Sequence, residues 1–172
     1  HRVGPLPATA GIGLRAPHYS ALLETQPAVG FIEVHSENYF GDGGLPLHYL
    51  EQARASYPLS LHGVGLSLGS TAPLDGHLRR LRALVERFEP PLVSDHLCWA
   101  AVGELHLNAL LPLPYPPAAL DLLASRICIV QDAPVRPLRA YTVSPYLYHS
   151  HPTPSPPAAP AAPPLPPASP LP

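Results

Sequence analysis

Two histidines stand at corresponding places in the chain, each at the end of a short apolar run and each followed by a turn. His62 lies in Pro58–Gly69 (PLSLHGVGLSLG) and His96 in Val93–Trp99 (VSDHLCW). Near-continuous apolar runs are typical of buried parallel strands, and α/β barrels place their chemistry at the carboxyl ends of such strands. The pattern favours a shared metal site over two separately packed histidines, and imidazole suits iron, zinc, copper and nickel alike.

The segment Phe31–Phe40 (FIEVHSENYF) supplies further polar side chains. Glu33, His35 and Glu37 share one strand face by two-residue alternation, and Asn38 follows them. Two interpretations stay open for Glu33 and His35: metal ligation at the same mouth, or a buried polar pair inside the domain. Glu37 and Asn38 are nearer the strand end, so we expect them to orient the metal ligands or to bind substrate.

For several other polar or reactive residues, the sequence gives weaker support for a role in the site. Arg15 lies at the end of the first predicted strand and could hold a carboxylate or phosphate, with a surface salt bridge as the alternative. Asp95 adjoins the second histidine and faces the other side of its strand, which favours a helix-facing or loop-capping role. Cys98 has no base-orienting motif beside it and is predicted to be a buried structural residue. His106 and Asn108 are expected in a loop that closes over the mouth.

The elements that must position these residues alternate between strand and helix. The predicted strands are Gly11–Arg15, Val29–Val34, Leu59–His62 and Leu92–Trp99, and a polar turn is predicted over His35–Phe40. The predicted helices are one that begins at Pro17, and Leu47–Ala55, Asp75–Phe88 and Pro116–Val130. Asp75 is the expected N-cap of its helix, and the apolar stripe of the last helix consists of Leu120, Leu123, Ile127 and Val130. Such alternation predicts βαβ units around a parallel sheet, and hence an α/β fold.

The composition narrows the function classes. The net charge of −2, with ten Lys+Arg (all arginine) against twelve Asp+Glu, gives no electrostatic case for nucleic acid or for an anionic membrane surface. No apolar stretch reaches the length of a membrane span. Two cysteines do not form the disulfide framework of a small secreted domain, so we expect a cytoplasmic protein.

The chain changes character near Pro134, and no charged residue follows Arg139. We divide it into an N-terminal segment (1–10), an α/β domain (11–147) and a Pro-rich tail (148–172) that is expected to be disordered. We interpret the tail as the product of a frame error or a pseudogene end, rather than as a spacer or a PxxP ligand of an SH3-type domain. The first residue is His1 and the chain has no methionine, which suggests an incomplete gene product.

Five segments in this order and spacing carry a family resemblance: GIGLRAPHY, FIEVHSENYF, PLSLHGVGLSLG, VSDHLCW and HLNALLPLPY. They resemble the multinuclear non-haem iron-dependent oxidases, which include the methanobactin-biosynthesis oxidase, over about residues 11–131. The resemblance implies a TIM (β/α)8 barrel of the xylose-isomerase type, of which four to five βα units would be present. It also implies two or three iron ions, with His62 and His96 among their ligands.

The activity implied by the resemblance is O2-dependent modification of cysteine residues in a ribosomally made precursor peptide, which a partner protein recruits. The family has a bridging glutamate in a Leu-Glu-Asn motif, but the matching segment Pro137–Ser144 (PLRAYTVS) places Tyr141 and Thr142 there. This departure implies at most a weak, partial iron site. A non-catalytic remnant or partner-binding half-barrel is therefore the alternative, and another metal-dependent TIM-barrel enzyme, a sugar isomerase or an endonuclease, is a weaker one.

Overall fold

The computed structural model describes residues 6–103, 105–113, 116–133 and 138–142. A five-stranded parallel sheet lies at its centre, in the order β1-β2-β3-β4-β7. The strands of this sheet are β1 (Gly11–Gly13), β2 (Phe31–His35), β3 (Leu59–His62), β4 (Leu92–Leu97) and β7 (Leu138–Thr142). A separate antiparallel pair consists of β5 (Trp99–Val102) and β6 (Leu105–Leu111).

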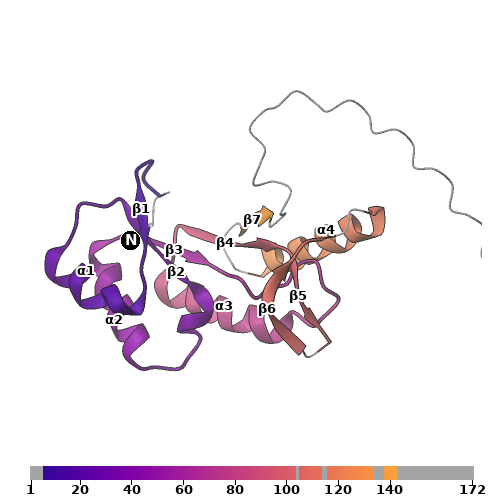
Figure 1. Ribbon diagram of the computed structural model, residues 1–172, viewed down its shortest axis with the longest axis horizontal. Coiled ribbons are helices and arrows are strands. Elements are labelled where there is room, and N and C mark those ends of the chain that lie inside the picture. The colour runs from indigo at the N-terminus through magenta and orange to yellow at the C-terminus, as the bar shows by residue number, and fades with distance from the viewer. Residues whose placement is uncertain (1–5, 104, 114–115, 134–137, 143–172) are drawn as a thin grey trace, which may run out of the picture.

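The helices come between successive strands of the sheet. They are η1 (Ala16–His18), α1 (Tyr19–Thr25), η2 (Ser36–Tyr39), α2 (Leu45–Ser56), α3 (Asp75–Phe88) and α4 (Pro117–Asp132). The strands of the sheet follow one another in chain order, and right-handed crossovers then bring each helix to the same face of the sheet. Figure 1 shows α1 and α2 toward one end of the molecule and α4 toward the other.

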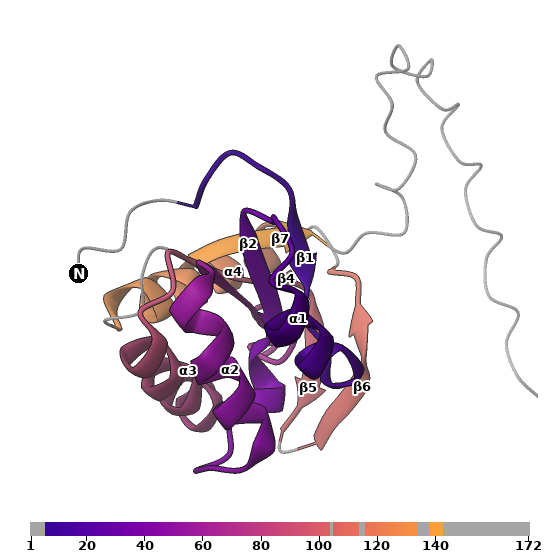
Figure 2. The ribbon, with the colours of Figure 1, turned by 90° about the vertical axis from the view of Figure 1, so that its left-hand side faces the viewer.

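The apolar core forms between the sheet and these helices. In α3, the predicted stripe of Leu78, Leu81, Leu84, Val85 and Phe88 is buried as expected. Helices α2 and α3 lie side by side (Figure 2), and Arg87 of α3 forms an ion pair with Glu51 of α2 at 2.6 Å. None of the helices in the described part of the chain is long and apolar enough to cross a membrane.

Several predicted boundaries are confirmed and others are wrong. The strand Leu59–His62 and the helix Asp75–Phe88 match β3 and α3. Asp75 is the first residue of its helix and not the N-cap, which is Leu74. The strand predicted to reach Arg15 ends at Gly13, since Pro17 places the chain in η1 immediately afterwards.

The segment after β4 differs most from the prediction. The strand expected to extend to Trp99 ends at Leu97, and Trp99 begins the hairpin of β5 and β6. His106 therefore lies in a strand rather than in a loop. In α4, Leu120 is 53% exposed because, at 100° per residue, it lies about 80° around the helix from the buried Val130. The predicted tail, 148–172, lies outside the described residues.

Candidate metal centre

The two histidines singled out in the sequence meet at the carboxyl ends of adjacent strands. His62 is the last residue of β3 and His96 lies one residue before the end of β4. Their Nε2 atoms are 2.9 Å apart, and their rings are inclined at 75° with centroids 4.7 Å apart. The parallel register of β3 and β4 brings these ends together, because each strand stops at the same edge of the sheet.

A serine that sequence reasoning missed fixes the orientation of the first histidine. Ser94 lies two residues before His96, so both side chains share one face of β4. The Ser94 Oγ lies 2.9 Å from His62 Nδ1. This contact on Nδ1 leaves Nε2 directed at His96, which is the arrangement that metal-binding histidines commonly have.

Both imidazoles are biased toward their neutral form. Burial lowers the pKa of His62, and the negative charges of Glu33 and Glu37 only partly oppose this effect. Burial also lowers the pKa of His96, and the neighbouring His62 and His35 lower it further. Neutral imidazole is the form that binds a metal ion, so the site favours ligation over protonation near neutral pH.

The two polar residues of β2 take different positions. The Glu33 carboxylate accepts a hydrogen bond from Ser60 Oγ at 2.8 Å, whereas the His35 ring packs edge-on against His62 with centroids 5.8 Å apart. The described contacts thus do not pair Glu33 with His35. Instead, each of them contacts a residue of β3, on the face that carries the two central histidines.

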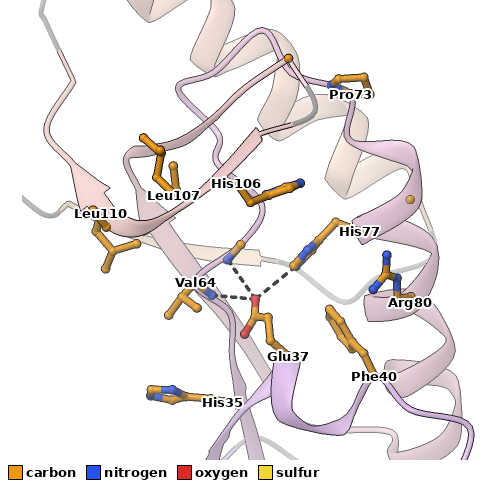
Figure 3. Close-up of a pocket in the computed structure, with 15 residues that line it drawn as sticks. His35, Glu37, Phe40, Val64, Pro73, His77, Arg80, His106, Leu107 and Leu110 are labelled. Atoms are coloured by element: carbon orange, nitrogen blue, oxygen red, sulfur yellow. Dashed lines mark hydrogen bonds and ion pairs between the residues drawn. The ribbon is translucent and has the colours of Figure 1, made fainter.

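Glu37 holds the loop that follows His62 (Figure 3). Its Oε1 accepts hydrogen bonds from the backbone N–H groups of Val64 and Gly65, both at 2.9 Å, and lies 3.2 Å from His77 Nε2. Burial alone would raise the pKa of Glu37, but the hydrogen bonds from His77 and the Val64 backbone outweigh it and lower the pKa. Glu37 is therefore an ionised anchor for this loop.

Asp95 anchors the same loop from the opposite side of β4. Its buried carboxylate accepts hydrogen bonds from the backbone N–H groups of Leu66 and His96, which agrees with the predicted loop-capping role. Burial raises its pKa to about 7. A Cβ at Gly63 would collide with this carboxylate, so the close approach requires glycine there.

Glu37, His77 and Asp95 form a second group of potential metal ligands. One ligand atom from each lies within 4.8 Å of the others. Both carboxylates already accept backbone N–H groups of the loop, however, and these bonds account for their positions without an ion. His77 was not predicted from the sequence, since it lies in an ordinary helical pattern and reaches Glu37 only through the packing of α3 on η2.

The side chains of two further predicted site residues, Arg15 and Asn38, are exposed, and their roles at the mouth stay predictions. The side chain of Asn108 lies outside the described part. Cys98 is buried, as expected of a structural cysteine, and burial together with the charge of Asp95 raises its pKa to about 12.

Strand β7, the outer strand next to β4, carries the position where the chain has tyrosine in place of the glutamate expected from the Leu-Glu-Asn motif. Tyr141 of β7 is the register partner of His96 in β4, and Thr142 is the partner of Leu97. A carboxylate at position 141 would thus come from the strand beside His96, and the chain has tyrosine there.

Comparisons with known proteins agree with the resemblance found in the sequence. Residues 9–155 match the family model described as RiPP precursor modification enzyme MbnB/TglH/ChrH. The chain is 50% identical over 143 residues to UPF0276 protein AM1_3026 of Acaryochloris marina, which covers 83% of this chain and 51% of that protein. It is 49% identical to a UPF0276 protein of Chromobacterium violaceum, over 83% and 51% of the two chains. The chain spans about half the length of these curated relatives.

Proposed function

Because the chain belongs to the MbnB/TglH/ChrH family of RiPP precursor modification enzymes, we propose that it carries part of an iron centre that oxidises cysteine residues of a precursor peptide. RiPPs are ribosomally made peptides that enzymes modify after synthesis. The observation that carries the proposal is the convergence of His62 and His96 at the ends of two parallel strands. The sequential strand order also supports the inference that the sheet is part of a TIM barrel.

The two imidazoles fit a shared metal ion. The Nε2 atoms of His62 and His96 are 2.9 Å apart, so the two rings would hold one ion together. The same distance fits a hydrogen bond between two neutral rings, in which the Nε2–H of one ring donates to Nε2 of the other, and a shared ion would take the place of that proton. The lowered pKa values of both rings keep them in the neutral form that a metal ion requires.

In the proposed reaction, bound iron would supply the redox chemistry with O2 while a peptide cysteine is oxidised. The contributions of the chain itself are binding and orientation. His62 and His96 would hold the ion, Ser94 would set the ring of His62, and Glu37 and Asp95 would fix the loop that begins at Gly63. A partner protein that recruits the peptide belongs to the same proposal.

A non-catalytic role is the second candidate, and the register of β7 favours it. Tyr141 stands beside His96 where the resemblance calls for a glutamate. Carboxylates are the hard donors that suit iron in its oxygen chemistry, so two imidazoles alone would form a weak site. In this case the chain would bind at most one ion and would not turn over substrate.

Metal analysis of purified protein tests the iron proposal. The chain is loaded anaerobically with Fe(II), desalted, and its iron content is measured by elemental analysis. We expect wild-type protein to retain up to one iron ion, and His62→Ala and His96→Ala each to lose it. His48→Ala is the matched control, because His48 is exposed on α2 and its ring contacts the side chains of Gln52 and Tyr49 rather than the histidine pair.

Full iron retention by both site variants would refute the ligand assignment. Oxygen consumption in the presence of a cysteine-containing peptide then separates the two candidates. Iron binding together with peptide-dependent oxygen uptake supports the oxidase, and iron binding without any uptake supports the non-catalytic role.

A further inference from the structure

A cavity of about 810 Å³ opens next to the histidine pair. Its polar lining includes Glu37 of η2, His77 and Arg80 of the first half of α3, and His106 of the hairpin. Figure 3 shows these side chains arranged around a common space. The cavity reaches the proposed iron centre through His35, whose ring packs against His62.

The charges around this cavity are unevenly balanced. Glu37 is already engaged by two backbone N–H groups and by His77, so its charge is locally compensated. Arg80 is exposed at the cavity and forms no ion pair with any residue that the structure describes. By contrast, Arg82 and Arg87 of the same helix pair with Glu86 and Glu51. Among the described residues that line the cavity, the Arg80 guanidinium is therefore a charge without an ion-pair partner.

The remaining wall is mainly apolar. Phe40 lies edge-on to His77 with centroids 5.0 Å apart, and Val64, Leu107 and Leu110 line the space around it. Ligand sites commonly combine such a wall with a few polar groups that fix orientation. An arginine at an apolar wall suits a carboxylate next to an apolar side chain, because guanidinium forms strong hydrogen bonds to carboxylate.

We propose that this cavity recognises a carboxylate of the precursor peptide, with Arg80 as the specificity-determining residue and with an apolar peptide side chain packed against Leu107 and Phe40. This inference rests on the proposed function, in which the substrate is a peptide. The carboxylate can belong to an acidic side chain or to the peptide C-terminus, since both present the same group to Arg80.

Calorimetric titration with three synthetic peptides distinguishes these sources. Serine replaces cysteine so that no oxidation occurs, and the protein is kept free of metal. The peptides are acetyl-Ala-Leu-Ser with a free C-terminal carboxylate, acetyl-Glu-Leu-Ser-amide, and the neutral acetyl-Gln-Leu-Ser-amide. We expect at least one of the acidic peptides to bind wild-type protein about tenfold more tightly than the neutral peptide.

Two arginine variants test the assignment of Arg80. In Arg80→Gln the preference for the acidic peptide should fall to within about twofold. Arg79→Gln is the matched control and should keep the preference, because Arg79 precedes Arg80 on α3 but does not line this cavity. Thermal melts should be unchanged, since both side chains are exposed.

A third variant tests the apolar wall. Leu107→Asn should weaken binding of all three peptides to a similar degree and preserve the preference for the carboxylate. Equal binding of acidic and neutral peptides to wild type, retained preference in Arg80→Gln, or no measurable binding of any peptide would each overturn the proposal. The outcome is independent of iron, because His62→Ala should leave peptide preference intact even if it abolishes metal binding.

Discussion

At the scale of single residues, the centre depends on side chains that hold other side chains. Ser94 sets His62 through Nδ1, while Glu37 and Asp95 hold the intervening loop by its backbone N–H groups. Such contacts matter because metal ligands gain affinity when their orientation is fixed before the ion binds. Of the two carboxylates, Glu37 is the one whose pKa is lowered, so its charge should stabilise the folded chain.

Replacing Glu37 should alter the pH dependence of stability. Its pKa is lowered in the folded chain from an ordinary value of 4.5, so its contribution is present above that pH and is lost as the pH falls through the folded-state pKa. Glu37→Gln loses the charge that contacts His77, and we expect it to lower the free energy of unfolding by about 1–2 kcal/mol at pH 7. The difference from wild type should shrink below about pH 4.

Urea unfolding at a series of pH values measures this effect. Glu86→Gln serves as the control, because Glu86 forms an exposed ion pair with Arg82 within one helix, and such pairs contribute about 0.5 kcal/mol or less. A constant difference between Glu37→Gln and wild type from pH 3 to pH 7 would contradict the role assigned to the ionised carboxylate.

The sequence predicted the site residues whose position depends on local pattern. His62 and His96 lie at the carboxyl ends of recognisable strands, so their approach follows from the parallel pairing of β3 and β4. His77 depends on how α3 packs against η2, a long-range contact with no local signal. Arg15 directly precedes η1 and its side chain is exposed, so its proposed contact with a substrate stays a prediction.

At the scale of elements, the loop from Gly63 to Ala72 connects the centre to the hairpin. Ser67 Oγ accepts the backbone N–H of Ala100 at 2.7 Å, Ser70 Oγ donates to the Ala101 carbonyl, and the Gly69 N–H bonds the Cys98 carbonyl at 2.8 Å. The loop that starts at the histidine pair is thereby fastened along β5. We therefore expect movements of the hairpin to be transmitted to this loop through these hydrogen bonds.

Removing one of these links should loosen the hairpin. In Ser67→Ala the buried N–H of Ala100 loses its acceptor, and we expect a stability loss of about 1–2 kcal/mol. Hydrogen exchange should become faster at the amide of Ala100, while the amide of Leu81 in the middle of α3 should keep its protection. Ser125→Ala is the control, since the Ser125 hydroxyl bonds its own helix at an exposed position. Unchanged exchange at Ala100 would show that the link does not hold β5.

Helices and strands were predictable where the apolar residues follow one clear spacing along the sequence. The helical stripe of α3 and the short apolar run of β3 gave correct boundaries. The hairpin was missed although its second strand, Leu105–Leu111, begins with alternating apolar and polar residues (LHLNA), a pattern typical of a strand. A second signal was Gly103 between the two strands, which has φ 57°, a turn conformation that glycine adopts readily.

At the scale of the whole molecule, the sheet has two outer strands. In the described part of the chain, β1 pairs only with β2, and β7 pairs only with β4. Unpaired strand edges are templates for association with other chains. Ile12 in β1 is 40% exposed, which adds apolar surface to one of these edges.

A charge on this edge should reduce self-association. We expect Ile12→Lys to lower the apparent mass of concentrated protein in sedimentation velocity, because an edge lysine opposes strand pairing between copies. Leu45→Lys is the matched control: Leu45 is 70% exposed on α2, away from either edge, and its replacement should leave the mass unchanged. Equal masses for Ile12→Lys and wild type at all concentrations would exclude β1 as a contact.

The sequential order of the strands also bears on how the polypeptide acquires its structure on the ribosome. Strand β2 can pair with β1, β3 with β2 and β4 with β3 as soon as each emerges, and the first pairings span short stretches such as the 27 residues from Glu33 to Ser60. Synthesis proceeds at about 5–20 residues per second, which is slow compared with closing loops of this size. The sheet can therefore grow vectorially, and the pairing of β3 with β4 that brings the two histidines together does not require β7.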